Sequence, residues 1–587
     1  MRSKLYYILF LALAGIMMAA ALVTVRESAY FQPFKTASGT GDGGTENSFI
    51  QVVSRESFEE RRQSLPEADF SPSDYLWRGG PAACDSEKAS VYLPCNVSAL
   101  TDLFAGLMPS APRSIIYVCR DEKMEDPAAA VEEGNAFEAL LVSGQHVQAF
   151  HIILTGLPAL CIEKTDREEI LNKEEHEGRL RYIPLDQTDA GTDFSEAADL
   201  SEVSDLSEAA DLSEAADLSE AAPDALLKCT FHVRGNVSSG MDKKPYKISL
   251  TNGAGEKMKV SLGGLRADDD WILNPLYTDQ SRVREMTAYT LWDRVSAFSD
   301  SPQASSRMRY VEVFLDHSYQ GIYGLMEPVD GTQLGLSPGD LLYKIDRWDR
   351  EYPYIDLYEE SEGKTEIYND YGFPCVEIRY PIAWDPSADW SPMQAFHEFS
   401  FRTKDPRSLT TAGLETDIDS VVTLSLYCAM THAMDNNWKN SFLIAKQTDG
   451  GGYQLFRTIW DLNYVFGDVF IFEPDEKYTV FDPKTASGYT PCEDSTYDFE
   501  AFLQADLSLE GSLADKWAVW RKGGISADSI CQDARAHMSR LTESGALARE
   551  MERWPQQKNC AEALDEMEEW IRTRFAYLDK RYGWNAR

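Results

Sequence analysis

The sequence is short of positive charge. Its 587 residues include 56 Lys and Arg against 96 Asp and Glu, so the formal net charge at pH 7 is -40. A protein that neutralises nucleic-acid phosphates needs Lys and Arg in excess, so this balance argues against nucleic acid as a partner. Closely spaced cysteine pairs are lacking too, because none of the ten Cys belongs to a CxxC motif. A structural zinc site is therefore not expected.

The N-terminus contains one long apolar run. Residues 5–25 carry no charge, and Arg2, Lys4 and Arg26 flank them. The run is long enough for a membrane-spanning helix, and its basic flank predicts that the rest of the chain lies outside the cytoplasm. We expect residues 1–26 to be an uncleaved signal anchor. A signal peptide cleaved near Ala19 to Ala21 is the alternative, and it would give a secreted protein.

Composition divides the rest of the chain into segments. Its length and its 43% hydrophobic content suggest two or three domains with a sizeable core. Residues 27–57 predict a flexible tether, and residues 58–156 predict a small accessory domain, within which 136–142 fit a helix or a strand. Residues 195–222 repeat an acidic hexapeptide whose period matches no helix face, so we expect a solvated insertion in a larger domain over 157–587.

One stretch carries the strongest chemical pattern. Asp435 is followed five positions later by Asn440, and two apolar runs, 441–445 and 453–460, flank a Gly-rich turn before Asp461. A hairpin would return Asp461 to the side of Asp435 and Asn440. Such a set suits phosphoryl transfer, in which one carboxylate orients a hydroxyl while the other and an amide oxygen hold Mg²⁺. A polar hairpin with a capping Asp and Asn is the alternative.

A second pattern gathers positive charge. Two strand-like segments, 229–233 and 246–250, flank a polar loop that contains glycine. This predicted hairpin holds four cations, which are Arg234, Lys243, Lys244 and Lys247. A glycine loop with exposed N–H groups and a strand-borne Lys suits phosphate binding. An exposed hairpin whose lysines prevent edge-to-edge aggregation is the alternative.

The next segment predicts an amphipathic helix over 281–295, with Ser281 as its N-cap. Its Glu285 would pair with Lys247, as the helix Glu of a protein kinase pairs with the phosphate-binding Lys. A first-turn Glu favoured by the helix dipole is the alternative.

Beyond this helix, residues 311–315 and 322–326 predict a second hairpin with its turn at 318–321. The returning strand ends at Glu327 and enters a polar linker, which is where a kinase-like fold would hold adenine with backbone groups. The Tyr- and Pro-rich residues 351–390 predict irregular structure.

Five motifs in this order resemble the CotH family, the spore-coat-type kinases with an atypical protein-kinase-like fold. They are RGNVSSGMDKKPYKISL, LGGLRADDDWILNPLYTDQSRVRE, YQGIYGLMEPVD, MDNNWKNS and IWDLNYVFGD. The resemblance covers Leu157 to Tyr582. It implies an α+β, two-lobed kinase-like domain that transfers the γ-phosphoryl group of ATP to Ser or Thr of a protein, with Mg²⁺ or Mn²⁺ as cofactor.

When the family's functional positions are transferred to the matching motifs of this sequence, the resemblance implies roles for individual residues. Asp435 would be the catalytic Asp, Asn440 a metal ligand and Asp461 the main metal-binding Asp. Lys247 would contact phosphate, with Lys244 as a possible substitute. The RGN motif, with Arg234 and Asn236, would lie on the nucleotide side together with Glu285 and Glu327.

The chain departs from the family pattern at two places. Asn463 stands where the family often has a second Asp, so it could coordinate a metal through oxygen but adds no charge. His432, three residues before Asp435, does not reproduce an HRD motif. Two alternatives to a kinase follow. One is a catalytically degenerate cell-surface scaffold with this fold, and the other is a carbohydrate hydrolase with paired carboxylates.

Overall fold

The computed structural model describes residues 49–96, 103–166, 170, 173–185, 226–235, 237–301, 303–346, 366–368, 374–381, 389–468, 483–484, 495–555 and 559–585. The predicted signal anchor, most of the predicted tether, the acidic repeat and Asn236 lie outside these ranges. No helix within them is long and apolar enough to cross a membrane.

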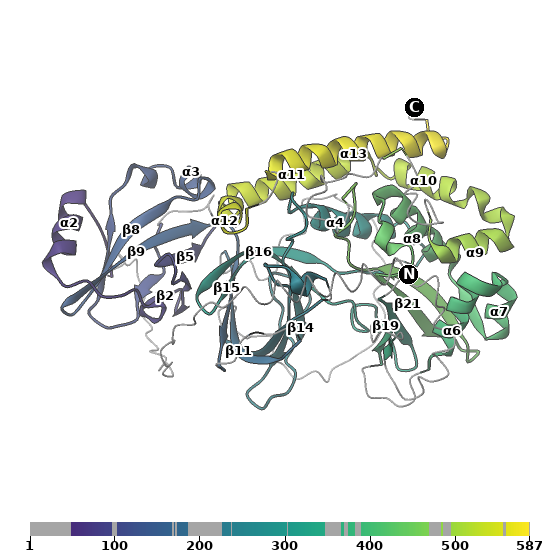
Figure 1. Ribbon diagram of the computed structural model, residues 1–587, viewed down its shortest axis with the longest axis horizontal. Coiled ribbons are helices and arrows are strands. Elements are labelled where there is room, and N and C mark those ends of the chain that lie inside the picture. The colour runs from purple at the N-terminus through teal and green to yellow at the C-terminus, as the bar shows by residue number, and fades with distance from the viewer. Residues whose placement is uncertain are drawn as a thin grey trace, which may run out of the picture.

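The first described part of the chain forms two sheets with two short helices (Figure 1). The larger sheet has the strand order β1 (Ile50–Val53), β7 (Ile115–Cys119), β8 (Ala136–Ser143), β9 (His146–Thr155), β5 (Ser90–Pro94) and β4 (Ala83–Asp85). The smaller sheet has the order β3 (Gly80–Pro81), β2 (Tyr75–Trp77) and β6 (Leu107–Pro109), and the helices are α2 (Arg55–Ser64) and α3 (Pro127–Glu132). The ambiguous segment 136–142 is thus a strand. Strand β1 lies inside the predicted tether and pairs in parallel with β7, so the accessory sheet begins at residue 50.

A closed barrel follows. Its strand order is β10 (Ala159–Lys164), β11 (His176–Ile183), β12 (Leu227–Val233), β13 (Tyr246–Thr251), β14 (Asp270–Asn274), β16 (Ser318–Met326) and β15 (Met308–Leu315), and parallel pairing of β10 with β15 closes it. Side chains alternate along each strand, so Tyr246, Ile248 and Leu250 fill the interior while Lys247 points outward. The predicted strands 229–233 and 246–250 are confirmed as β12 and β13.

The turn between β15 and β16 lies earlier than predicted. It consists of Asp316 and His317, with φ of 48° and 58°, rather than residues 318–321. Both angles suit the two-residue turns whose twist matches a hairpin. Gly321, which suggested a turn, lies inside β16 beside a bulge, where a Cβ would collide with the carboxylate of Glu550. The close approach of the Glu550 side chain to the backbone, and not a chain reversal, therefore explains why glycine occupies this position.

Helix α4 (Arg284–Ser296) packs between the barrel and the second half of the molecule. It begins three residues after the predicted start, and Ser281 is not its cap. Instead, the Asp279 carboxylate accepts hydrogen bonds from the backbone N–H groups of Ser281 at 2.9 Å and Arg284 at 2.8 Å. A polar side chain thus accepts hydrogen bonds at the start of the helix as predicted, but it belongs to Asp279 and not to Ser281.

The second half of the molecule is built on another six-stranded sheet. Its order is β18 (Glu366–Tyr368), β19 (Pro374–Tyr380), β17 (Leu341–Ile345), β21 (Ser441–Gln447), β22 (Tyr453–Ile459) and β20 (Leu414–Thr416). The β21–β22 hairpin confirms the pattern around Asp461, and Ser441 pairs with Ile459. Strands β18 and β19 arise within residues 351–390, where the prediction of irregular structure was wrong. Strand β19 pairs with the buried strand β17, and β18 pairs with β19, so sheet formation overrides the local Tyr and Pro content.

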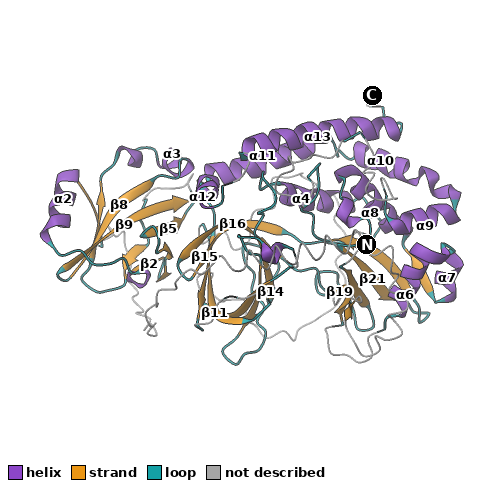
Figure 2. Cartoon of the chain, viewed as in Figure 1, coloured by secondary structure: helices purple, strands orange, loops and turns teal. Residues whose placement is uncertain are grey.

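Helices cover this sheet and continue back to the barrel (Figure 2). They are α6 (Ser391–Glu398), α7 (Pro406–Thr411), α8 (Ile418–Thr431), α9 (Tyr497–Ala505), α10 (Ser512–Lys522), α11 (Ala527–Glu543), α12 (Ala546–Arg553) and α13 (Cys560–Arg581). The described residues also contain short 3₁₀ helices (72–74, 122–124, 238–240, 434–436, 507–511), and α6 continues into a π-helical turn over 399–403. Helix α12 contacts β16 and the accessory side of the barrel. The fold is therefore mixed α+β.

Candidate active site

The Asp435 loop begins where helix α8 ends. His432 adopts a left-handed conformation (φ 56°) as the C-cap, and residues 434–436 form one 3₁₀ turn. The Asp435 carboxylate is partly exposed and lies 2.6 Å from Lys439 Nζ, and Asn440 Nδ2 donates a hydrogen bond to Asp435 Oδ2 at 3.2 Å. His432 is buried against Trp570, and burial lowers its pKa to about 3, so it stays neutral and structural. Asp435 thus presents an accessible carboxylate on a fixed turn.

Asn440 is held in place by backbone hydrogen bonds to both neighbouring strands. Its N–H donates to the carbonyl of Ile345 at 2.8 Å, and its carbonyl accepts from the N–H of Trp460 at 2.9 Å. The Asn436 amide donates to the carbonyls of both Asn440 and Trp460, at 2.9 and 2.6 Å. Asn436, which the sequence reasoning did not single out, therefore fastens the Asp435 loop to the strand that leads to Asp461.

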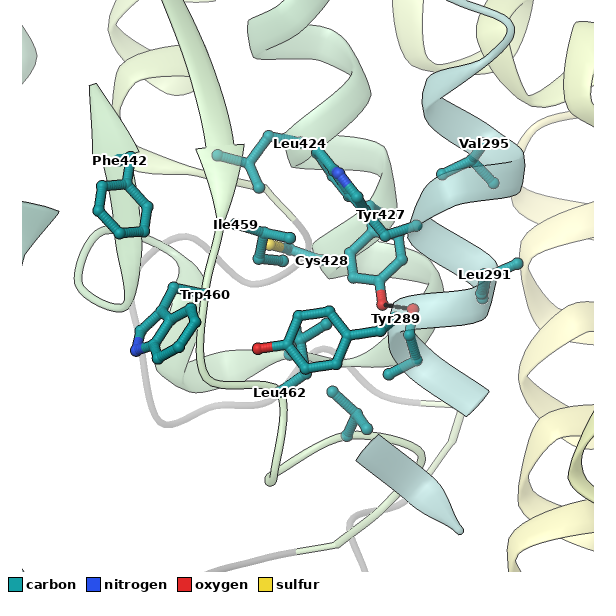
Figure 3. Packing of buried hydrophobic residues seen from close by; sticks show 14 of the residues in the cluster. Tyr289, Leu291, Val295, Leu424, Tyr427, Cys428, Phe442, Ile459, Trp460 and Leu462 are labelled. Carbon is teal, nitrogen blue, oxygen red and sulfur yellow. Dashed lines mark hydrogen bonds between the residues drawn. The ribbon is translucent and has the colours of Figure 1, made fainter. Parts of the chain in front are cut away.

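Asp461 follows β22 in a left-handed conformation, with φ of 59°, and Asn440 has φ of 52°. Such angles are uncommon for residues other than glycine and concentrate at functional sites. The Asp461 N–H donates to the Tyr289 hydroxyl at 3.1 Å, so helix α4 fixes the turn from behind. Figure 3 shows Tyr289 and Trp460 packed with Leu462 in the buried core beneath this site.

The surroundings of Asp461 disfavour the ionised form of its carboxyl group. Burial raises the pKa of Asp461, and the nearby Asp435 carboxylate raises it further, while Lys439, Arg234 and Lys344 oppose these effects. Asn463, two residues on, is half-buried, and its buried Oδ1 accepts no hydrogen bond from the residues that the structure describes. Neighbouring carboxylates with spare amide oxygens are the donor set that Mg²⁺ prefers, so these residues fit a hard divalent cation. Among the described residues, no three His, Cys, Asp or Glu side chains form a metal cluster by themselves.

Comparison with protein families relates the sequence that carries this site to a known group. A family model described as CotH kinase protein matches residues 231–578, more than half of the chain. The chain belongs to the CotH kinase family. None of the curated proteins compared with the chain matches it. The matched region starts inside β12, so β10, β11 and the accessory sheets precede it although β10 and β11 complete the barrel.

The four cations of the β12–β13 hairpin have different environments. Arg234 lies with its guanidinium 5.7 Å from the centroid of Trp460, next to Asp461. Lys247 forms an ion pair with Asp270 at 3.0 Å on the outer face of the barrel, and Lys244 donates to the carbonyl of Ser239 at 3.1 Å. Arg234 thus lies at the site, whereas Lys247 is held by Asp270 on the barrel surface and Lys244 stays within its own loop.

Lys243 is the structural member of that hairpin. Its buried ammonium lies 2.8 Å from Glu550 Oε1 and 2.9 Å from Oε2, and it donates to the carbonyl of Ile322 at 2.5 Å. Burial lowers the pKa of Lys243 to about 7 although the Glu550 charge opposes this effect. Lys243 ties the barrel to helix α12 and takes no part in the site.

The predicted ion pair between Glu285 and Lys247 is wrong. Glu285 is 3% exposed and accepts a hydrogen bond from Asn274 Nδ2 at 2.7 Å, while Lys247 pairs with Asp270. Burial raises the pKa of Glu285 to about 8, and the Asp461 charge contributes. The pairing of β13 with β14 gives Lys247 a partner in Asp270, and the packing of α4 against β14 gives Glu285 a partner in Asn274.

Glu285→Gln should therefore stabilise the protein most at high pH. The pKa of Glu285 is about 8 in the folded chain against 4.5 ordinarily, so between these values the unfolded chain loses a proton that the folded chain keeps, and stability falls as pH rises. Gln keeps the bond from Asn274 without the charge. We expect a gain of up to about 4 kcal/mol near pH 8 and little near pH 5, measured by urea unfolding.

Glu562→Gln is the matched control, because Glu562 is an exposed first-turn Glu on α13. It should leave the unfolding free energy unchanged at either pH. An equal effect of Glu285→Gln at both pH values would show that Glu285 is already ionised in the folded protein.

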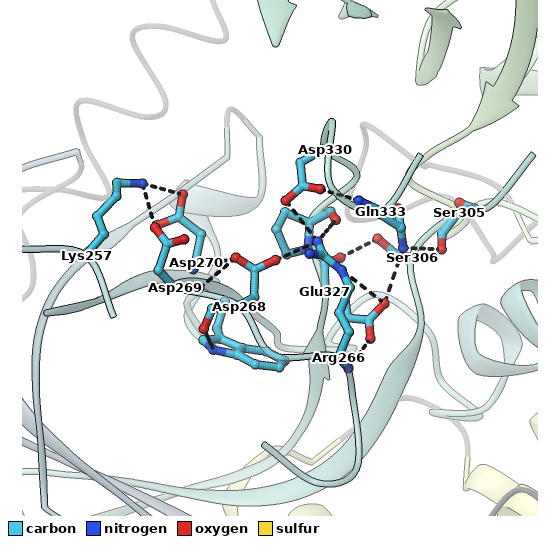
Figure 4. Close-up of polar contacts among 12 residues, drawn as sticks. Lys257, Arg266, Asp268, Asp269, Asp270, Ser305, Ser306, Glu327, Asp330 and Gln333 are labelled. Atoms are coloured by element: carbon cyan, nitrogen blue, oxygen red, sulfur yellow. Dashed lines mark hydrogen bonds and ion pairs between the residues drawn. The ribbon is translucent and has the colours of Figure 1, made fainter. Parts of the chain in front are cut away.

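Glu327 belongs to a polar network at the barrel rim (Figure 4). Its carboxylate accepts from the N–H of Arg266 at 2.8 Å and from Gln333 Nε2 at 3.2 Å, and its backbone carbonyl accepts from the Ser306 hydroxyl. The Arg266 guanidinium also pairs with Asp268 at 2.6 Å and Asp330 at 2.9 Å. The carboxylate and carbonyl of Glu327 thus hold the linker after β16 in place. These contacts give no support to the predicted nucleotide contact of Glu327.

The sequence reasoning missed several residues that shape this CotH site. Lys439 could have been found, since it lies four residues after Asp435 and directly before Asn440. Tyr289, Asn274 and Asp270 could not, because their contacts depend on how α4 and β14 pack against the loop and on strand register.

Proposed function

We propose that this chain is a protein kinase that transfers the γ-phosphoryl group of ATP to a Ser or Thr hydroxyl of a protein. The observation that carries the proposal is the convergence of Asp435, Asn440 and Asp461. Asp435 accepts a hydrogen bond from Asn440, and its charge lies close enough to Asp461 to raise the pKa of the Asp461 carboxyl group. Family membership supports kinase chemistry in general. In this proposal the barrel with α4 is one lobe, and the β17–β22 sheet with its helices is the other.

Each residue has a role in the reaction. The acceptor hydroxyl oxygen forms a bond to the γ-phosphorus while the bond from that phosphorus to the β,γ-bridging oxygen breaks, and the hydroxyl proton passes to the Asp435 carboxylate. Lys439 holds that carboxylate in place. Mg²⁺ or Mn²⁺, when bound by Asp461 and Asn440 with Asn463 nearby, would neutralise phosphate charge. Arg234 and Lys247 contribute positive charge from the barrel side.

The proposal is tested by label transfer from ATP to a Ser-rich protein acceptor, with and without Mg²⁺, beside the Asp435→Ala variant. The wild-type chain should transfer label and the variant should not, with both giving the same thermal midpoint. Transfer that persists in Asp435→Ala would overturn the assignment.

Lys247→Ala should raise KM for ATP about tenfold or more, since a charge-assisted hydrogen bond to phosphate contributes about 1.5–3 kcal/mol. Asp270 retains hydrogen bonding from Ser249 and an ion pair with Lys257, so the strand should stay folded. Lys228→Ala, an exposed Lys on the adjacent strand β12, is the control and should leave KM unchanged. An unchanged KM in Lys247→Ala would remove this residue from the phosphate site.

A second candidate function is a catalytically degenerate scaffold with the kinase fold. Asn463 favours it, because the amide supplies no charge to the metal. Nucleotide or metal binding without any label transfer would support the scaffold, whereas turnover dependent on Asp435 would exclude it.

We also propose that the protein works outside the cytoplasm, anchored by residues 1–26. The apolar run 5–25 with basic flanks supports this placement. The chain should resist alkaline extraction from membranes, and protease added outside intact cells should cleave it. Release by alkali would favour the cleaved signal peptide, and protection from external protease would contradict the placement.

A further inference from the structure

A fully buried ion pair lies beside the Asp435 loop, residues 435–440. Arg457 projects from β22 and Asp498 from the first turn of α9, and Arg457 Nη1 lies 3.3 Å from Asp498 Oδ2 with neither side chain exposed. Among the residues that the structure describes, neither Asp498 oxygen accepts a hydrogen bond. A buried ion pair often gives no more stability than apolar residues of the same volume. Stability alone therefore gives a weak account of this pair.

The guanidinium of Arg457 contacts the Asp435 loop at two points. Its Nη2 donates to the Ser441 hydroxyl at 2.9 Å, and that hydroxyl donates to the backbone carbonyl of Trp438. Its Cζ also lies 5.5 Å from the centroid of the Trp438 ring, within the range of a cation–π contact. Arg457 thus contacts both ends of the segment 438–441, whose two middle residues contact the Asp435 carboxylate.

The helices beside the sheet enclose Trp438 on its other sides. Its ring stacks on Phe396 of α6 with 6.0 Å between the centroids, and Phe401 in the π-helical turn meets it edge-on at 4.6 Å. Phe401 also packs on Tyr497 of α9, and the Tyr497 N–H donates to the carbonyl of Asn437 at 3.2 Å. The helix that supplies the buried carboxylate is therefore bonded to the loop itself.

The metal-binding side of the candidate site has supports of its own. The backbone of Asn440 bonds to both neighbouring strands, and the Asp461 N–H donates to the Tyr289 hydroxyl. These supports do not pass through Arg457. Loss of the Arg457 contacts would therefore move Asp435 with respect to a metal site that stays in place.

We propose that the Arg457–Asp498 pair positions the Asp435 loop for phosphoryl transfer, through the Ser441 hydroxyl and the Trp438 ring. Arg457 is a positioning residue, because it acts on Asp435 through other residues. This inference rests on the proposed kinase function. A displacement of about 1 Å at a reacting group lowers the rate by up to about a hundredfold, so the effect should fall on kcat and leave KM for ATP unchanged.

The first test is Ser441→Ala in the full-length chain, which removes the hydroxyl between Arg457 and the Trp438 carbonyl and keeps the ion pair. We expect kcat for label transfer to fall about tenfold or more with KM for ATP unchanged. The backbone amides of residues 435–439 should exchange hydrogen for deuterium faster, while exchange in α13 keeps its wild-type rate.

Ser544→Ala is the matched control. Ser544 is also buried, and its hydroxyl also donates to the carbonyl three residues earlier, that of Leu541, at 2.9 Å. This variant should leave both kcat and the exchange of residues 435–439 unchanged.

The second test removes both charges. Arg457→Met combined with Asp498→Asn leaves no charge of this pair buried without its partner, so the chain should keep its fold and thermal midpoint. Its kcat and the protection of residues 435–439 should fall at least as far as in Ser441→Ala. Arg457→Lys should lie between the double variant and the wild type, because an ammonium can pair with Asp498 but lacks the planar fork that reaches Ser441 at the same time.

The outcomes separate this inference from the proposed function. Unchanged kcat, or unchanged exchange over residues 435–439, in Ser441→Ala and in the double variant would overturn the inference and leave the kinase proposal in place. A loss of kcat accompanied by an equal rise in KM for ATP would overturn it as well. A wild-type chain that transfers no label would contradict the kinase, and faster exchange in the variants would then still support the positioning of the loop. No label with unchanged exchange would overturn both.

Discussion

Asp461→Asn should reduce phosphoryl transfer by roughly a thousandfold, the scale expected when one preorganised electrostatic contact to the transition state is removed. Asn keeps the shape of the side chain and lacks its negative charge. The turn should persist, because the backbone N–H of Asp461 and the Tyr289 hydroxyl hold it. The measurement is kcat for label transfer at saturating ATP and Mg²⁺.

The same variant should be no less stable than the wild type. Burial and the Asp435 charge raise the pKa of Asp461, so its ionised form costs stability at neutral pH, where the unfolded chain is fully ionised. Removing the charge removes that cost, which is the trade between activity and stability expected at a functional site. Loss of activity with an unchanged or higher thermal midpoint would identify a functional carboxylate.

Asp449→Asn is the control for Asp461→Asn. Asp449 is exposed at the opposite end of the same β21–β22 hairpin, so the substitution makes the same chemical change away from the site. It should leave kcat and the thermal midpoint unchanged. A thousandfold loss in both variants would point to damage to the hairpin.

Glu550→Gln should destabilise the protein by about 3–5 kcal/mol, the cost of leaving a buried charge without its partner. Glu550 is fully buried on α12 and receives Lys243 Nζ at 2.8 Å, Arg282 Nε at 3.0 Å and the N–H of Ile322 at 2.8 Å. Gln has the same volume, yet it leaves two cations without a counter-charge. The measurement is the free energy of unfolding in urea.

Glu552→Gln is the matched control on the same helix. Its ion pair with Lys88 is exposed, and such pairs contribute at most about 1 kcal/mol. Equal stability of Glu550→Gln and Glu552→Gln would contradict the assigned role of the buried cluster. The adjacent residue Arg549 pairs with Glu312 at 2.9 Å and donates to Thr155 Oγ1 at 2.9 Å. Helix α12 therefore joins the barrel and the accessory sheet through two buried polar clusters.

The sequence predicted those features that depend on local pattern. Alternating and apolar runs around a Gly-rich turn gave the β21–β22 hairpin, and the spacing of Asp435, Asn440 and Asp461 followed from it. Strands β12 and β13 were predicted for the same reason.

Features that depend on register and packing could not be predicted. The partner of Lys247 is set by the pairing of β13 with β14, which brings Asp270 beside it and leaves Glu285 to Asn274. Gly321 indicated a turn, but a bulge and the approach of Glu550 require it. Arg379 lay in a Tyr- and Pro-rich stretch whose strand character comes from pairing with β17. Each of these outcomes depends on residues far apart in the sequence.

The most direct measurement compares ATP radiolabelled at the γ-phosphorus with ATP radiolabelled at the α-phosphorus, each incubated with the full chain, Mg²⁺ and a Ser-rich acceptor. We predict that only the γ-label reaches a Ser or Thr of the acceptor or of the chain itself, and that Asp435→Ala abolishes it. Protein labelled from the α-position would show nucleotidyl transfer instead, and absence of both labels with ATP still bound would contradict the kinase account.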